Sequence, residues 1–435
     1  MNAVVLRPRH RLHLFQGADE LFAAVVHAIE HSSHEVRLES YIFAFDKQGQ
    51  AVASALESAA LRGVRVYLVV DGIGTPPLPP QWTARFDAAG VHWHRFSPLG
   101  WLGVFFPVRW RRLHRKLCVV DGRVAFCGGI NVIDDFQDPH LGTLDSARLD
   151  FAVQVHGPLV QDTQALMQRF WSRLDFAHGL ESRQWSKAGS QLRSALRPQP
   201  APMRAPAPQD SQGKIPAALV LRDNLRNRSR IEQAYRQAIG QAHHEVLIAN
   251  AYFMPGRKLR HALEHAAKRG VRVILLLQGR YEYFMQFHGA RAVYGSLLAA
   301  GVQIHEYQGG LLHAKVAVVD SVWATVGSSN LEPLSLLLAR EANVVLRDPH
   351  FAQVLHQRVR KAIDQQSVQM DPLRYAQRGR WQRTLDVLAL LILRIGLFVV
   401  GRRYSRVPAP AQTRVHDACF AIGPVVPEEN AGNMV

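Results

Sequence analysis

The stretch "LLHAKVAVVDSVWATVGSSN", residues 311–330, decides how this chain is organised. It is an apolar, β-branched run that carries His313 and Lys315 two residues apart and Asp320 five residues later. Alternate residues of a β-strand share a face, so we expect the histidine and the lysine to point the same way. A single polar stripe of this kind is also compatible with a histidine buried in a core, so one copy decides little.

A second copy of the pattern occurs earlier in the chain, in "LHRKLCVVDGRVAFCGGIN", residues 113–131. The conserved spacing is H-x-K-x4-D-x6-G-x2-N in both copies. Its members are His114, Lys116, Asp121, Gly128 and Asn131 in the first copy and His313, Lys315, Asp320, Gly327 and Asn330 in the second. Five matched positions at a fixed spacing indicate a site with chemistry rather than two unrelated core residues.

The repetition extends well beyond the two motifs. "SHEVRLESYIF" (33–43) matches "HHEVLIANAYF" (243–253), and "RGVRVYLVVDG" (62–72) matches "RGVRVILLLQG" (269–279). The chain is therefore built from two homologous halves. Within each half, helical stretches alternate with β-branched runs, which is typical of an α/β fold with helices on both faces of a sheet.

Length and composition suit two domains with accessory segments, since the chain has 435 residues and is 48% hydrophobic. Residues 186–215 are rich in Pro, Ala, Ser and Gln and separate the halves, so we interpret them as a semi-rigid linker. The predicted domains are residues 1–185 and 216–370. A basic and apolar membrane-associating segment with a flexible tail follows at 371–435.

Cysteine usage and the start of the chain bear on the cellular compartment. The three cysteines, Cys118, Cys127 and Cys419, predict neither a disulfide framework nor a zinc site, and a reducing cytoplasm is expected. The first twenty residues contain no apolar run of signal-peptide length. We therefore expect neither secretion nor an N-terminal membrane span.

A long apolar run, "LDVLALLILRIGLFVVG", occupies residues 385–401. It is interrupted by Arg394 and flanked by six arginines, which are Arg378, Arg380, Arg383, Arg402, Arg403 and Arg406. The run is short for a membrane span, which needs ~20 residues, so we predict a helix that lies in the membrane interface or dips into it. A buried core helix is the alternative.

The charge balance favours a polyanionic partner, because 52 Lys and Arg against 35 Asp and Glu give a formal net charge of +17. The first half also carries an insertion just before its motif, at residues 97–113. This insertion combines aromatic and basic side chains, namely Trp101, Phe105, Phe106, Trp110, Arg111 and Arg112. The combination favours a loop that rests on a phospholipid surface, with stacking on single-stranded nucleic acid as the alternative.

Two histidine–lysine pairs suit the covalent cleavage of a phosphodiester. Histidine can act as a nucleophile or as a general acid near neutral pH, and this reaction needs one imidazole in each role. The lysines suit the non-bridging oxygens of the phosphate, and Asn131 and Asn330 can donate further hydrogen bonds. The sequence offers no carboxylate cluster spaced to hold a metal ion, so we expect neither a metal nor a cofactor.

The duplicated motif resembles that of the phospholipase D superfamily, over roughly residues 8–370. Four segments are similar to the bacterial cardiolipin synthases of the B type: "HRKLCVVDGRVAFCGGIN", "ESYIF", "LDFAVQVHGPLV" and "NAYFMPG". The resemblance implies two homologous phospholipase D-like α/β sandwich domains related by a pseudo-twofold axis, with the active site at their interface. It also implies a phosphohistidine intermediate and transfer of a phosphatidyl group to a glycerol hydroxyl.

The resemblance implies a role for each motif residue. It makes His114 the nucleophile and His313 the general acid and then the base, but the symmetry of the motifs leaves this assignment reversible. Phosphate binding falls to Lys116, Lys315, Asn131 and Asn330. A secondary phosphate contact is expected at Ser328 and, in the first motif, at Gly129, which replaces the usual serine.

The carboxylates of the chain fall into two groups. Asp121 and Asp320 belong to the catalytic motif, yet strand geometry places them at strand ends, where they would brace the fold. A carboxylate that orients each imidazole is still required, because an unoriented histidine attacks poorly. Asp150 in "ARLDFAVQV" and Glu341 in "LLLAREANVVL" precede matching β-runs downstream of the motifs and are the candidates.

The leading interpretation is a cardiolipin synthase that transfers phosphatidyl groups as a peripheral protein on the cytoplasmic side of the inner membrane. The expected substrates are phosphatidylglycerol and, as an alternative donor, phosphatidylethanolamine; no nucleic-acid partner is expected. One alternative is a phospholipase D-type phosphodiesterase or nuclease. A second alternative is a non-catalytic anionic-lipid-binding protein, which two intact histidine–lysine pairs disfavour. The sequence leaves the oligomeric state open.

Overall fold

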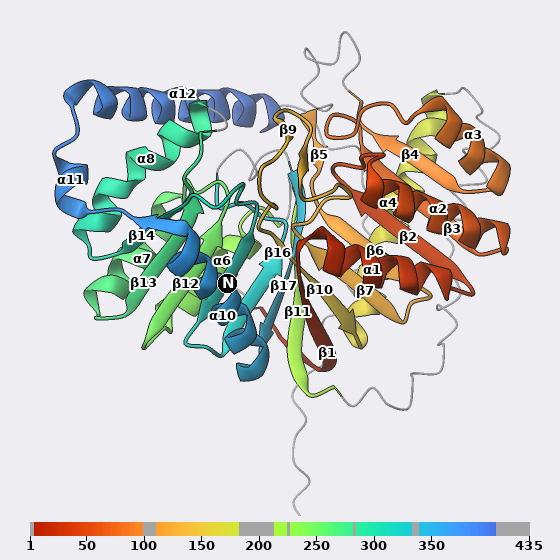
Figure 1. Ribbon diagram of the computed structural model, residues 1–435, viewed down its shortest axis with the longest axis horizontal. Helices are drawn as coiled ribbons and strands as arrows, with labels where there is room; N and C mark the ends of the chain where they lie inside the picture. Colours follow the sequence, from red (N-terminus) through yellow and green to blue (C-terminus); the bar gives the residue numbers. More distant parts are fainter. Residues whose placement is uncertain are drawn as a thin grey trace, which may run out of the picture.

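The structure, a computed structural model, describes residues 4–98, 110–181, 213–223, 227–281, 284–332 and 339–405. One 16-stranded mixed sheet runs through both halves of the chain. Strands β1 and β11 pair antiparallel and join the halves at the middle of this sheet (Figure 1). The predicted α/β architecture of two homologous domains is confirmed, with the two sheets merged into one.

The first half lies on the right of Figure 1. Its elements are β1 (Arg7–Gln16), α1 (Gly17–Glu30), β2 (Glu35–Ser40), α2 (Lys47–Leu61), β3 (Arg65–Asp71), α3 (Pro80–Ala89), β4 (His92–Phe96), β5 (Arg112–Leu113), β6 (Lys116–Val120), β7 (Val124–Gly128), β8 (Gln137–Asp138), β9 (Gly142–Thr143), β10 (Phe151–His156) and α4 (Pro158–Glu181).

The second half lies on the left of Figure 1. Its elements are β11 (Ile215–Arg222), α6 (Arg230–Gly240), β12 (Glu245–Asn250), α7 (Arg257–Lys268), β13 (Arg272–Gln278), α8 (Phe284–Ala299), β14 (Gln303–Tyr307), β15 (Lys315–Val319), β16 (Trp323–Gly327), β17 (Ala339–Arg347), α10 (Pro349–Gln366), β18 (Ser367–Gln369), α11 (Pro372–Ala376) and α12 (Arg380–Ser405).

Helices form because their apolar residues recur on one face. In α1 the buried side chains are Ala18, Leu21, Phe22, Val25 and Ile29, a spacing that places them on one stripe against the sheet. Helices α1, α2 and α3 share one core with the first half of the sheet, and α6, α7 and α8 share another with the second half. A central core contains residues of both halves together with α4 and α10. The two halves are therefore packed into one unit around the motif strands.

The apolar run near the end of the sequence forms part of α12, which packs along α8 (Figure 1). Asp386 and Ala389 are buried on the packed face, and the Asp386 carboxylate lies 2.7 Å from His288 Nδ1 and accepts from Arg378 Nη1 at 2.9 Å. The opposite face exposes large apolar side chains, which are Trp381, Val387, Leu388, Leu391, Ile392 and Ile395. Within the described ranges, no helix combines the length and apolar character that crossing a membrane requires.

Several predicted features fall outside the described residues. These are Trp101, Phe105 and Phe106 of the aromatic insertion, residues 186–212 of the linker, and residues 406–435 of the tail, with Cys419 among them. The division into domains at these points stays a prediction.

Candidate active site

Each motif histidine lies just before a strand and is held by a backbone contact to the other half. The strands β6 and β15 begin at Lys116 and Lys315, two residues after the histidines. The His114 amide donates to the Arg340 carbonyl at 3.0 Å, and the His313 amide donates to the Leu149 carbonyl at 2.9 Å. The histidines were predicted to lie on the strands themselves. They lie outside the regular strands because their backbone groups bond to the opposite half.

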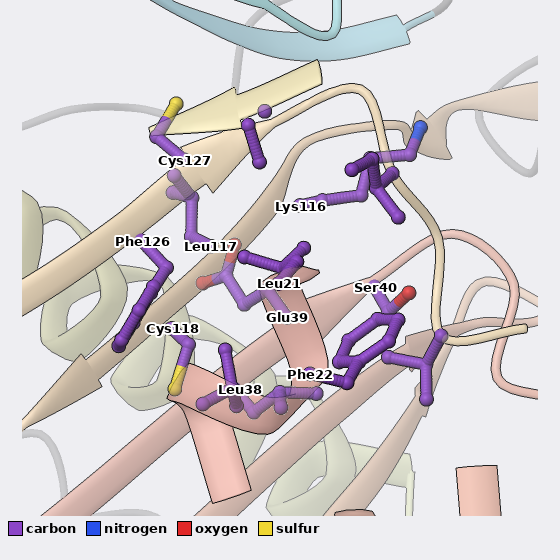
Figure 2. Close-up of a pocket in the computed structure, with 15 residues that line it drawn as sticks. Leu21, Phe22, Leu38, Glu39, Ser40, Lys116, Leu117, Cys118, Phe126 and Cys127 are labelled. Carbon is purple, nitrogen blue, oxygen red and sulfur yellow. The ribbon is translucent and has the colours of Figure 1, made fainter. Parts of the chain in front are cut away.

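Both lysines are buried beside their histidines. Lys116 is 6% exposed and Lys315 is fully buried. Lys116 Nζ donates to the His114 carbonyl at 2.8 Å, and Lys315 Nζ donates to the His313 carbonyl. Figure 2 shows the Lys116 amino nitrogen pointing away from the apolar side chains of Leu38, Cys118 and Phe126. The lysine stems therefore line the core while their charges are held next to the imidazoles.

The two candidate orienting carboxylates reach the histidines across the domain boundary. Asp150 Oδ2 lies 2.6 Å from His313 Nδ1, and Glu341 Oε1 lies 3.3 Å from His114 Nδ1. Asp150 belongs to the first half and His313 to the second, while Glu341 and His114 have the reverse arrangement. Each histidine–carboxylate pair thus contains one residue from each half. Neither half carries a complete pair alone.

The two pairs differ because a buried arginine contacts one of them. Arg222 Nη2 donates to Glu341 Oε2 at 2.7 Å, and Arg222 is 3% exposed. The strand register pairs Arg222 with Glu341, whereas Gln16 pairs with Phe151, so the equivalent position beside Asp150 is Gly17. Asp150 instead lies 3.8 Å from Lys315 Nζ. The site is therefore symmetric in its histidines and asymmetric in the cations that contact its carboxylates.

Burial and the neighbouring charges shift the pKa values of the carboxylates in opposite directions. Burial raises the pKa of Asp150 to about 6, against the influence of Lys315. Burial alone would also raise the pKa of Glu341, but Arg222 and then His114 outweigh it, so the pKa of Glu341 is lowered. Glu341 is consequently held ionised, whereas Asp150 takes up a proton near pH 6.

The imidazoles and Lys116 are shifted toward their neutral forms. Burial, followed by the charge of Lys116, lowers the pKa of His114 to about 4, and burial and then Lys315 lower that of His313 well below its ordinary value. Burial and then Lys315 lower the pKa of Lys116 to about 7. Cations crowded away from water in this way favour the entry of an anion, which would raise their pKa values again.

The structure places the motif aspartates away from the histidines. Asp121 accepts hydrogen bonds from the backbone amides of Ser33, His34 and Glu35, at 2.8–2.9 Å. Asp320 accepts from His243, His244 and Glu245 in the same way. Each aspartate follows the far end of its strand, ~16 Å along the chain from the motif lysine at 3.3 Å per residue. In these positions they brace the start of β2 and of β12.

The other predicted phosphate contacts lie in the loops after β7 and β16. Asn131 Oδ1 accepts from the Ile42 amide at 3.1 Å, and Asn330 is buried beside Arg222, whose Nη1 lies 3.5 Å from the Asn330 carbonyl. The Ser328 hydroxyl accepts from the Ala342 amide at 3.2 Å and is fully buried, so it braces β17.

Gly129 lies against the carboxylate of Asp150. A Cβ at this position would lie 2.3 Å from Asp150 Oδ1. The glycine therefore makes room for Asp150, and this close approach accounts for the absence of the usual serine in the first motif.

Sequence reasoning missed three residues that shape the site. Arg222 carried no motif, and its role depends on the pairing of β11 with β17. The Tyr41 ring lies 4.9 Å from the His114 ring, centroid to centroid. The buried Asp71 accepts from the Leu113 amide at 2.7 Å and from Arg112 Nη1 at 3.0 Å, which fixes the segment before His114. A signal for Asp71 was available, since a carboxylate ends the β3 run "RVYLVVD".

No group of three or more His, Cys, Asp or Glu side chains able to hold a metal ion occurs within the described part of the chain. The charges that meet in the site belong to the two lysines, the two histidines, the two orienting carboxylates and Arg222.

Two interlocked α/β halves that each contribute one H-x-K motif to a shared site define a phospholipase D-like protein. The family model described as "Cardiolipin synthase, PLD-like domain" matches residues 25–138 and 235–363, and the chain belongs to this family.

Known relatives support this assignment over nearly the full length. Cardiolipin synthase B of Shigella flexneri is 36% identical over 423 residues, which cover 93% of this chain and 94% of that protein. Cardiolipin synthase B of Escherichia coli K12 is 36% identical over 417 residues, which cover 93% of each protein. The crystal structure of phosphatidylserine synthase from Haemophilus influenzae has the same fold, with a TM-score of 0.60 at 12% identity, covering 89% of this chain and 94% of that one.

Proposed function

We propose that this protein is a cardiolipin synthase that transfers a phosphatidyl group from one phospholipid to a glycerol hydroxyl of phosphatidylglycerol. The observation that carries the proposal is the exchange of carboxylates between the halves, which completes two histidine–carboxylate pairs in one buried, cationic site. The similarity to two cardiolipin synthases over 93% of the chain supports the choice of substrate class.

The first step cleaves the donor lipid. The Nε2 lone pair of His114 attacks phosphorus, and the bond from phosphorus to the departing headgroup oxygen breaks as that oxygen takes a proton from His313. Lys116 and Lys315 neutralise the non-bridging oxygens as negative charge grows on them. With phosphatidylglycerol as donor, the products are free glycerol and a phosphatidyl group on His114.

The second step reverses the roles with a new alcohol. His313, now neutral, takes the proton from a glycerol hydroxyl of the acceptor, and that oxygen attacks phosphorus as the bond to His114 breaks. The products are cardiolipin and the free enzyme. Two molecules of phosphatidylglycerol thus become one cardiolipin and one glycerol, and phosphatidylethanolamine as donor would release ethanolamine instead.

The asymmetry of the carboxylates supports His114 as the nucleophile. Glu341, held ionised by Arg222, can accept the Nδ1 proton of His114 in a hydrogen bond and leave Nε2 unprotonated for attack. His313 can take up the proton that a general acid needs once an anionic substrate raises its lowered pKa, and the Asp150 carboxylate, 2.6 Å away, would stabilise the imidazolium.

Membrane association is proposed to use the apolar face of α12. Leu388, Leu391, Ile392 and Ile395 are each about half exposed on the side of α12 turned away from α8. Figure 1 places this helix along the same end of the molecule as β5, which immediately precedes His114. A helix that lies flat with apolar residues on its free face suits peripheral binding on the cytoplasmic side of the inner membrane.

The test is a transfer assay with phosphate-labelled phosphatidylglycerol. We expect cardiolipin and glycerol as products, and His114→Ala and His313→Ala should each lower the rate ~10²-fold or more. A rapid quench in neutral detergent should leave a phosphate-labelled phosphatidyl adduct on His114 that is stable in base and lost in acid. Phosphatidic acid as the only product would show a phospholipase, and an adduct on His313 would reverse the assignment of the two histidines.

A further inference from the structure

A second cationic cluster lies behind the motif of the first half. Five arginines from three segments lie close enough to repel one another, namely Arg111, Arg115, Arg169, Arg173 and Arg340, and two of them contact the ring of Phe170 on α4. Arg115 Cζ and Arg340 Cζ each lie 4.9 Å from the centroid of this ring. Mutual repulsion with Arg115, Arg173 and Arg111 adds to burial in lowering the pKa of Arg340 to about 10.

The charges of this cluster are poorly matched by carboxylates. Arg115 forms an ion pair with Glu39. Arg340, in contrast, has a buried Nε with no hydrogen-bond partner among the described residues, and its guanidinium contacts aromatic rings. Arg169 and Arg173 project from α4 into solvent. Asp223 attracts the Arg340 guanidinium, but burial and the repulsion of three other arginines outweigh it. The cluster therefore keeps a positive excess that an anionic ligand would neutralise.

The cluster is coupled directly to the catalytic residues. Arg340 is adjacent to Glu341 in β17, and its carbonyl accepts the His114 amide at 3.0 Å. Arg340 and Arg115 face α4, because both contact the Phe170 ring. Glu341, the neighbour of Arg340 in β17, points to the opposite face and reaches His114. The cluster is therefore close to the reaction yet separate from the lysines that serve the scissile phosphate.

We propose that Arg340, with Arg169 and Arg173, binds the phosphodiester group of a second phospholipid molecule while the first one reacts. The proposal rests on the proposed function, because joining two phospholipids requires the enzyme to hold two phosphodiester anions at once. The same chemistry could come from the acceptor lipid of the reaction or from an anionic lipid of the bilayer that does not react. Guanidinium groups suit either, since they bind phosphate oxygens in pairs.

A competition between two soluble acceptors tests whether the arginines bind the phosphodiester group of the acceptor lipid. Unlabelled phosphatidylglycerol in detergent serves as donor, and glycerol and acyl-free glycerophosphoglycerol, each carrying a different isotope label, are added at equal concentration. The ratio of the two transfer products reports recognition of the acceptor phosphate and does not depend on how much enzyme is folded. Arg340→Gln, and separately the surface double variant Arg169→Gln with Arg173→Gln, should lower this ratio about tenfold or more, and Arg340→Lys should lower it less.

Vesicle binding tests whether the arginines instead bind an anionic bilayer lipid that does not react. Sedimentation with vesicles of phosphatidylcholine containing phosphatidylglycerol, against pure phosphatidylcholine, should show a smaller preference for the anionic vesicles in the double variant. The matched control is Arg257→Gln, an exposed arginine on α7 in the other half. A changed acceptor ratio assigns the subsite to the acceptor, and a changed vesicle preference alone assigns it to a bilayer lipid.

If neither quantity changes in either variant, the proposal is wrong. If wild-type protein forms no transfer product, the proposed function fails, and the vesicle measurement still decides whether the arginines bind lipid phosphate.

Discussion

Replacing Lys116 by methionine is expected to inactivate the protein and to make it more stable. Lys116 is 6% exposed, and burial together with the charge of Lys315 lowers its pKa from an ordinary value of 10.5 to about 7. The unfolded chain therefore binds more protons than the folded chain between pH 7 and pH 10.5. Stability rises with pH across this window, and the cost of the buried ammonium is fully present below it.

The size of the effect follows from the two pKa values. At about 1.4 kcal/mol for each pH unit, the buried lysine costs ~4 kcal/mol of unfolding free energy at pH 7. Methionine has a similar length and no charge, so Lys116→Met should recover most of this unfolding free energy. For a chain of this length the gain corresponds to a rise in melting temperature of about 4 °C.

Thermal unfolding of wild type and variant between pH 7 and pH 10 measures the effect. The difference in melting temperature should be largest at pH 7 and should shrink toward pH 10, because protonation of this lysine favours the unfolded wild-type chain less and less as the pH approaches 10.5. Lys47→Met, at an exposed position at the start of α2, serves as the control and should show no such trend. A variant less stable than wild type, or a difference that stays constant with pH, would refute the reasoning.

Four further outcomes are expected. Arg222→Met should lower kcat by roughly tenfold or more. It should also move the acid limb of the pH–rate profile to higher pH, because Glu341, which Arg222 holds ionised, would protonate more easily. Arg222→Lys should restore part of the rate and part of the pH profile. Gly129→Ser should displace Asp150, whose Oδ1 would lie 2.3 Å from the new Cβ, and should lower activity by about tenfold with an unchanged fold. Excess EDTA should leave the rate unchanged, since lysine and asparagine side chains meet the phosphate charge, and inactivation restored by a divalent ion would contradict this. Leu391→Ser with Ile395→Ser should weaken vesicle binding at an unchanged melting temperature, because both side chains are about half exposed, and a lowered melting temperature would show that they pack in the protein.

The sequence by itself determined the features that depend on local periodicity. The second copy of the histidine–lysine spacing, at His313 and Lys315, revealed the duplication, although the shared strand face that this spacing predicted was wrong because both histidines lie just before their strands. The same logic led to Asp150 and Glu341, since each precedes a β-run at a matching place. Duplication also predicted the α/β class, because both halves repeat the same order of helices and strands.

Only the tertiary structure decided that the carboxylate of each half contacts the histidine of the other half. Asp150 reaches His313 and Glu341 reaches His114 because the central strands merge into one sheet, and strand neighbours are selected by burial over the whole sheet. Arg222 is far from Glu341 in the chain, and only the register of β11 against β17 brings them together.

Contacts between distant segments also decided which face of α12 is buried. Its central run, residues 385–401, is almost entirely apolar, so periodicity could not distinguish an interface helix from a core helix. Packing against α8 buries Asp386 and Ala389 and leaves Leu391 exposed, which gives the helix one face of each kind. Sequence encodes how each segment folds locally, whereas the asymmetry of the site and the free face of α12 arise from contacts between segments that are distant in the chain.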